Sequence, residues 1–204
     1  MSHLHRSAAD GRRNAARGQS LVEFSVAVPV FIMILFGMLE FGFAFSHNLT
    51  LEYGTREGAR TGAALGKGTA SVPCAVDSSG TSPVDQQIIA AVQRVLTSPG
   101  SPVEVNRISQ VTIYQANASG NSTGSANVWI PGAGPTVDGV ALKFKQSSVG
   151  WNACSRDNGS TPDSIGIGLT YSYRLISPLG VFLGMTGSPA FTMSDRTVMA
   201  LNPS

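Results

Sequence analysis

The sequence predicts an α+β protein with one long N-terminal helix that crosses a membrane. A small exterior domain with one further helix and an antiparallel sheet follows it. Three observations support this fold class: an apolar stretch of membrane length near the N-terminus, an amphipathic helical pattern in the middle of the chain, and a clean alternation of apolar and polar residues near its end. One membrane helix and one small domain account for 204 residues.

Residues 1–18 form a basic leader that we expect to be removed. The leader holds four arginines and one aspartate, a net charge of +3. The whole chain has 14 basic and 12 acidic residues, so residues 19–204 keep 10 and 11, a net charge of −1. The basic excess is therefore a topology signal. It predicts a cytoplasmic N-terminus and an extracytoplasmic C-terminal domain, and it does not predict nucleic-acid binding.

Residues 19–65 are expected to form a transmembrane and stalk helix. Its apolar part, Phe24–Phe45, would span about 33 Å, which matches a hydrocarbon core of about 30 Å. Pro29 lies inside this stretch and is expected to kink the helix. Glu40 lies near the outer end, where a carboxylate is unfavourable, so we expect it to pair or to reach the interface.

Small residues recur at every fourth position from the outer end of the apolar stretch onward. Such a ridge lets another helix approach closely at a crossing angle. The alternative is a frayed helix, because each interior glycine costs about 0.5–1 kcal/mol relative to alanine. The members are Gly42, Ser46, Thr50, Gly54, Gly58, Gly62 and Gly66.

A charged flank accompanies this ridge at residues 56–60. Arg56 and Arg60 lie four residues apart and share a face, and Glu57 lies beside Arg60. The segment predicts a docking site for a partner helix, in which Gly58 sets the approach distance and the charges set the register. The alternative is a solvated stalk with local ion pairs worth about 0.2–0.5 kcal/mol each.

Residues 66–204 are expected to form the exterior α+β domain. Ser82 and Pro83 are typical of a helix start, and the apolar stripe that follows predicts an amphipathic helix ending at residues 98–100. Residues 117–163 are rich in Gly, Ser and Asn and predict a long loop with one or two short strands.

Four runs predict strands in this domain. The run from Ile165 to Leu175 alternates with a period of two, and the last run loses phase near Asp195, which indicates a bulge or a partly exposed edge. The runs are Val103–Val105, Ile108–Ala116, Ile165–Leu175 and Phe191–Leu201.

Cys74 and Cys154 both fall in the domain predicted to lie outside, where thiols are normally oxidised. We expect a disulfide, which would contribute up to about 4–5 kcal/mol in the chain-entropy model. The alternative is two unpaired thiols. Two cysteines alone are too few for a zinc site.

No motif in the sequence predicts an enzyme, a cofactor or a metal site. Residues 120–124 match the Gly-x-Ser-x-Gly nucleophile motif, but no histidine is placed to act as its base, so we interpret them as a loop. Residues 157–163 have acidic oxygens without the spacing of a calcium loop and indicate a turn. Trp129 and Trp151 are interpreted as core or loop anchors, with exposed contact aromatics as the alternative.

The N-terminal part of the chain resembles the TadE-like family of bacterial tight-adherence (Flp-type) pilus assembly proteins. The resemblance is strong over residues 17–64 and weak beyond them. It implies a minor pseudopilin, which is a single-pass membrane protein without enzymatic activity. The residues that carry it are Arg17-Gly18-Gln19-Ser20-Leu21-Val22-Glu23-Phe24, Pro29, Glu40-Phe41-Gly42 and Arg56-Glu57-Gly58-Ala59-Arg60.

This resemblance leads to a processing hypothesis. A membrane prepilin peptidase would cut after Gly18, so that Gln19 becomes the first residue and Glu23 the fifth. The Glu23 carboxylate would then meet the free amine of Gln19 on a neighbouring pilin or pseudopilin. The alternatives are an uncleaved signal anchor and a Glu23 that touches only lipid headgroups.

A second function class stays open. The chain could be a signal-anchored exterior protein whose Gly/Ser/Asn loop binds a ligand or a surface. A conventional signal peptide cut near residues 44–46 would belong to that class. The expected partners under the first class are the membrane, the peptidase and other pilins or pseudopilins, with no small-molecule substrate.

Overall fold

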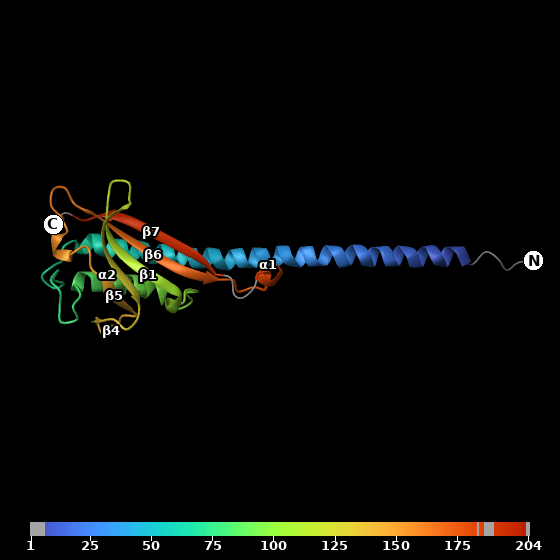
Figure 1. Ribbon diagram of the computed structural model, residues 1–204, viewed down its shortest axis with the longest axis horizontal. Coiled ribbons are helices and arrows are strands. Elements are labelled where there is room, and N and C mark those ends of the chain that lie inside the picture. Colours follow the sequence, from blue (N-terminus) through green and yellow to red (C-terminus); the bar gives the residue numbers. More distant parts are fainter. Residues whose placement is uncertain (1–6, 183, 186–189, 203–204) are drawn as a thin grey trace, which may run out of the picture. The chain divides into compact units, whose positions relative to one another are not determined.

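The protein has the α+β fold that the sequence predicts (Figure 1). The computed structural model describes residues 7–182, 184–185 and 190–202. The helices are α1 (Ser7–Leu65), α2 (Pro83–Leu96), α3 (Leu179–Phe182) and two 3-10 turns (Val105–Arg107 and Ala153–Ser155). The strands are β1 (Ile108–Ala116), β2 (Ser122–Pro131), β3 (Thr136–Val137), β4 (Val140–Ala141), β5 (Phe144–Ser148), β6 (Ser164–Arg174) and β7 (Ala190–Ala200).

The chain divides into two compact units, and α1 contributes to both. The first unit comprises residues 1–43 and 175–189, and the second comprises residues 44–174 and 190–204. The sequence placed the start of the exterior domain at residue 66, whereas the second unit already begins at Ala44. The reason is packing, since Leu51 and Ala59 of the expected stalk are fully buried. Much of that stalk is therefore part of a domain core.

The second unit is built on a five-stranded sheet in the order β5-β2-β1-β6-β7. All of its neighbouring strands are antiparallel. The alternation predicted for β6 is confirmed, because its apolar side chains are buried in the core. These side chains are Ile165, Ile167, Leu169, Tyr171 and Tyr173. A separate two-stranded sheet joins β3 to β4.

Two strand predictions were wrong. Residues 117–163 are not a long loop with one or two short strands, because they hold four strands, of which β2 and β5 join the main sheet. Their polar composition hid these strands, since β2 fully buries only Asn127 and Trp129. Residues 103–105 are not a strand either, and a 3-10 turn begins at Val105.

The bulge expected near Asp195 is absent from the described β7. This strand pairs with β6 in unbroken register from Ala190 to Ala200. It is the edge strand, as the sequence allowed. The loss of phase has another cause: Asp195 faces α1, where its carboxylate accepts a hydrogen bond from the Thr55 hydroxyl. Thr197 joins this contact at 3.0 Å from the same hydroxyl oxygen.

The small-residue ridge of α1 packs closely against its own domain. A Cβ atom on Gly58 would lie 2.6 Å from Val92 of α2. One on Gly62 would lie 2.6 Å from Ile165 of β6. The close approach that the ridge predicts is thus found, and it takes place within the chain.

Both tryptophans are buried, as expected of core or loop anchors. Trp129 is fully buried and Trp151 is 4% exposed. The predicted helix at residues 83–96 is confirmed, and Ser82 occupies its N-cap position. The Ser82 side chain makes no capping hydrogen bond there.

Candidate membrane anchor and assembly site

The N-terminal part of α1 exposes a continuous apolar surface. Within residues 19–65 an 18-residue window has a mean hydropathy of 2.3, and none of that window is buried. Phe24, Phe31 and Phe41 are between 61% and 73% exposed. A soluble surface rarely carries an apolar patch of this extent. Among the described residues, α1 is the one helix that is long and apolar enough to cross a membrane.

The proposed processing residues lie on one continuous stretch of helix. The backbone of α1 is helical through Gly18. At the next position, the Gln19 side-chain amide donates a 3.1 Å hydrogen bond to the exposed Glu23 carboxylate of the same helix. In the unprocessed chain, Glu23 therefore has a local partner. Its pairing with a neighbouring chain stays a prediction.

Glu40 is buried in the first unit, with 5% exposure. Its carboxylate accepts hydrogen bonds from two successive backbone amides. The N–H of Ile176 donates to both oxygens at 3.1 and 3.2 Å, and that of Ser177 donates at 2.8 Å. The sequence indicated that Glu40 needs a partner but not where it lies, because the partners are backbone groups 136 and 137 residues away.

Residues 56–60 do not form the expected docking site. Gly58 is buried against α2 and β6, so no partner helix can approach through it. Arg56 and Arg60 are exposed and form ion pairs within α1, Arg56 with Glu52 and Arg60 with Glu57 at 3.8 Å. Exposed pairs of this kind contribute little. The charged side chains fit the alternative of a solvated surface with local ion pairs. Gly58 packs inside the second unit.

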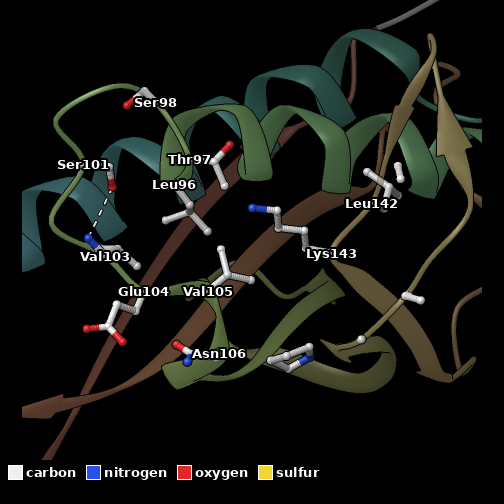
Figure 2. A pocket seen from close by; sticks show the side chains of 14 residues that line it. Leu96, Thr97, Ser98, Ser101, Val103, Glu104, Val105, Asn106, Leu142 and Lys143 are labelled. Carbon is white, nitrogen blue, oxygen red and sulfur yellow. Dashed lines mark hydrogen bonds between the residues drawn. The ribbon is translucent and has the colours of Figure 1, made fainter.

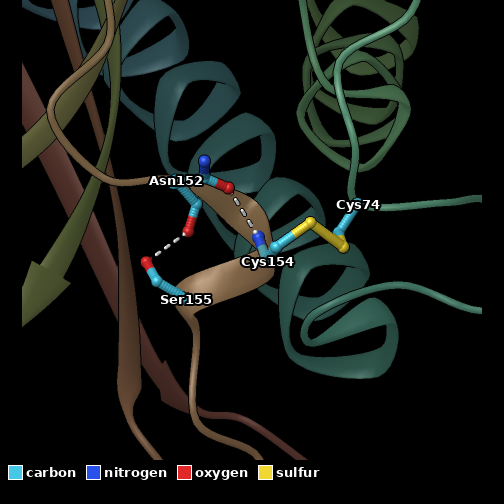
Figure 3. The surroundings of a disulfide bond; sticks show 4 residues. All are labelled: Cys74, Asn152, Cys154 and Ser155. Carbon is cyan, nitrogen blue, oxygen red and sulfur yellow. Dashed lines mark hydrogen bonds between the residues drawn. A yellow bond between two sulfur atoms is a disulfide. The ribbon is translucent and has the colours of Figure 1, made fainter.

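The two cysteines are joined in the structure, as Figure 3 shows. Their Cα atoms are 4.9 Å apart across a separation of 80 residues. The bond ties the loop between α1 and α2 to the 3-10 turn at residues 153–155. That turn is braced by Asn152, whose side chain accepts a 2.8 Å hydrogen bond from the Cys154 amide. The disulfide thus holds the loop that follows α1 against the segment that precedes β6.

A buried polar cluster lies beside α2, and sequence reasoning missed it. Asp85 pairs with Arg156, and both side chains are almost completely buried. The Asn127 amide donates to the second Asp85 oxygen at 2.6 Å, and its carbonyl accepts from the Trp151 amide at 2.8 Å. The Arg156 guanidinium also lies 4.7 Å from the centre of the Trp151 ring. In the sequence, the signal for this cluster was the Asp85 carboxylate, which lies among the apolar residues of α2.

His47 also lies in an unexpected place. It follows the apolar stretch by two residues, a position that suggests the membrane face, but its side chain is 5% exposed in the second unit. Its ring centre lies 5.0 Å from that of Tyr173 and 5.6 Å from that of Tyr171. We therefore interpret His47 as an aromatic core residue.

Hydrogen bonds lower the pKa of the Asp77 carboxyl. The bond from the Ser79 side chain contributes most, and the bond from Gln86 is next. The Ser79 hydroxyl donates at 2.5 Å, and the Gln86 amide donates at 2.7 Å. Both donors favour the charged carboxylate. This cluster fixes the loop that leads into α2.

An open groove of about 840 Å³ lies at the C-terminal end of α2 (Figure 2). Apolar side chains such as Leu96, Val103 and Leu142 line it together with the charged Glu104 and Lys143. The described residues that line the groove include no histidine, cysteine or aspartate.

The Gly-x-Ser-x-Gly match has no catalytic geometry. Ser122 begins β2 directly after the turn that connects it to β1, whereas the motif requires a strand followed by a helix. Across residues 7–182, 184–185 and 190–202, no three His, Cys, Asp or Glu side chains gather as a metal site would require. Residues 157–163 form a turn, in which the amide of Asp157 donates to the Asp163 carboxylate at 2.9 Å.

Comparison with known proteins gives a match on helix α1. Residues 18–60 match the family model described as TadE-like protein. No curated protein and no solved structure matches the chain. The matched segment begins at the proposed processing glycine and ends at Arg60, so apart from Arg17 it contains the residues that carried the sequence resemblance. Over residues 18–60 the chain is thus similar to the TadE-like family model, which supports a component associated with a tight-adherence pilus.

Proposed function

We propose that the protein is a minor pseudopilin-like membrane component of a tight-adherence (Flp-type) pilus assembly or secretion system. The TadE-like match over residues 18–60 carries this proposal. The apolar surface of α1 supports a single-pass anchor. The proposal includes no enzymatic activity and no cofactor.

The orientation follows from charge. The arginine-rich leader would stay in the cytoplasm, and the second unit would lie outside the membrane. The disulfide supports this orientation, because such bonds persist in oxidising compartments. Partners would be other pilins or pseudopilins and the prepilin peptidase.

Processing after Gly18 would free the Gln19 amine. Glu23 would then exchange its local amide partner for the charged amine of a neighbouring chain. A buried unpaired carboxylate is strongly unfavourable, so this pair would favour the correct axial register between subunits. Glu23→Gln keeps the shape of the side chain and removes its charge. It should reduce the co-purification of pilin partners without lowering the amount of exported protein.

The mature N-terminus tests the proposal most directly. Full-length protein extracted from membranes should begin at Gln19 when the peptidase is co-expressed. Gly18→Leu should block this cleavage, and Gly11→Leu is the matched control in the same leader. A mature chain that begins at Met1 would contradict processing.

The alternative function, a signal-anchored exterior binding protein, has the open groove in its favour. It predicts a conventional cut near residues 44–46. The same experiment distinguishes it, since a chain beginning near His47 would contradict the pseudopilin proposal. Helix α1 continues through this position and through Gly18, so either cut would need local unwinding.

A further inference from the structure

The segment that connects β6 to β7 is unusually apolar. No residue between Arg174 and Asp195 is charged. The described part of its first half, residues 175–182, 184 and 185, is named here the β6–β7 segment. It contains the short helix α3. Ile176 is 60% exposed and Met185 is 40% exposed. Transfer of these side chains from water to an apolar environment would be favourable.

Glu40 attaches this segment to the membrane helix. The amides of Ile176 and Ser177 donate to its carboxylate, and the carboxylate is 5% exposed. The contact satisfies the hydrogen-bonding groups of both partners, the Glu40 carboxylate and the two backbone amides. Backbone amides at membrane depth need acceptors, and a carboxylate at that depth needs donors.

The position of Glu40 on α1 gives the depth of the contact. The apolar stretch ends at Phe45, five residues after Glu40. A rise of about 1.5 Å per residue places Glu40 about 7.5 Å inside the outer end of that stretch. Interfacial apolar elements lie about 5–10 Å deep, at the boundary between headgroups and acyl chains. The two depths agree.

We propose that the β6–β7 segment is a second membrane contact, which lies in the lipid interface and is held there by Glu40. The occupant of its exposed apolar surface is lipid, because the segment is hydrogen-bonded to α1 within the apolar stretch. The inference depends on α1 spanning the membrane and not on a role in a pilus.

A fluorescent probe tests the contact. The native cysteines form a disulfide, so a single added cysteine can be labelled selectively. Ile176→Cys in the full chain is labelled with nitrobenzoxadiazole and placed in nanodiscs of phosphatidylethanolamine and phosphatidylglycerol. Val149→Cys is the matched control, because both residues are 60% exposed. The probe at residue 176 should emit at shorter wavelength and lose intensity to nitroxide-labelled lipid. The probe at residue 149 should lose intensity to aqueous iodide.

Two outcomes would overturn the lipid contact. In one, iodide quenches both positions equally. In the other, the probe at residue 176 is shielded from iodide and from nitroxide lipid alike, which would indicate a protein occupant. Glu40→Ala should move the probe at residue 176 from lipid quenching towards iodide quenching. An unchanged pattern in a variant with native circular dichroism would overturn the role of Glu40.

Discussion

A Cβ atom on Gly58 would lie 2.6 Å from Cγ2 of Val92, so α1 and α2 approach each other closely at a position where α1 lacks a side chain. Ile167 of β6 lies 3.4 Å from the same point. Helix, helix and sheet thus meet at Gly58. The glycine that looked like a docking surface is a packing position in the core.

We predict that Gly58→Leu destabilises the second unit. Leucine raises helix propensity, but overpacking a filled core costs about 1–3 kcal/mol. Urea denaturation of the detergent-solubilised chain, followed by circular dichroism, should show a lower midpoint. Ala64→Leu, on an exposed position of the same helix, is the control and should leave the midpoint nearly unchanged.

A double mutant separates steric conflict from other effects. Val92→Ala removes the methyl group that a Cβ atom on residue 58 would meet. Gly58→Ala should therefore be less harmful in the Val92→Ala background than in the native chain. Equal effects in both backgrounds would show that Val92 is not the neighbour that excludes a side chain.

The elements that local pattern determines were predictable. The apolar helix, the amphipathic helix and the alternating β6 each carry their own periodicity. Strands β2 and β5 do not, because only two residues of β2 are buried and its place in the sheet comes from pairing with β1 and β5. These two strands could be predicted only if the strands with which they pair were already known.

The candidate site shows the same division. The need of Glu40 for a partner follows from its place in an apolar helix, whereas the amides of Ile176 and Ser177 are distant in sequence and carry no side-chain signal. Asp195 is similar. Its interruption of the alternation was visible, but its contact with Thr55 depends on which helix covers the sheet.

The disulfide should be the largest single covalent contribution to the stability of the domain. Its loop of 80 residues predicts up to about 4–5 kcal/mol in the chain-entropy model. Replacing both cysteines with serine should lower the free energy of unfolding, measured in urea, by up to this amount. Intact mass after alkylation, with and without reductant, measures the bond directly. Two alkylated thiols in the native exported protein would show that the bond is absent.

Asp77 gives a prediction for acidic pH. Its folded pKa lies below the ordinary 3.8, chiefly because Ser79 donates to the carboxylate. A lowered folded pKa stabilises the fold above the unfolded pKa, and this contribution is lost as the pH falls through the folded pKa. Carbon-detected NMR titration of the side-chain carboxyl should show the lowered pKa. Ser79→Ala should raise it towards 3.8, and an unchanged value would contradict the assigned cause.

The buried pair of Asp85 and Arg156 should be sensitive to the loss of either charge. Asp85→Asn leaves the Arg156 guanidinium buried without a carboxylate, and two of its nitrogens already lack a hydrogen-bond partner among the described residues. Breaking such a pair costs about 3–5 kcal/mol. The free energy of unfolding, measured in urea, should fall by about this amount.

The chain offers a matched control for the same chemical change. Glu104 pairs with Arg107 at 3.2 Å in a partly exposed position, so Glu104→Gln should change stability by about 0–1 kcal/mol. Asp85→Asn combined with Arg156→Met removes both buried charges and should recover part of the loss, because no unpaired guanidinium remains. If Asp85→Asn and Glu104→Gln had equal small effects, the buried pair would not stabilise the fold through its charge.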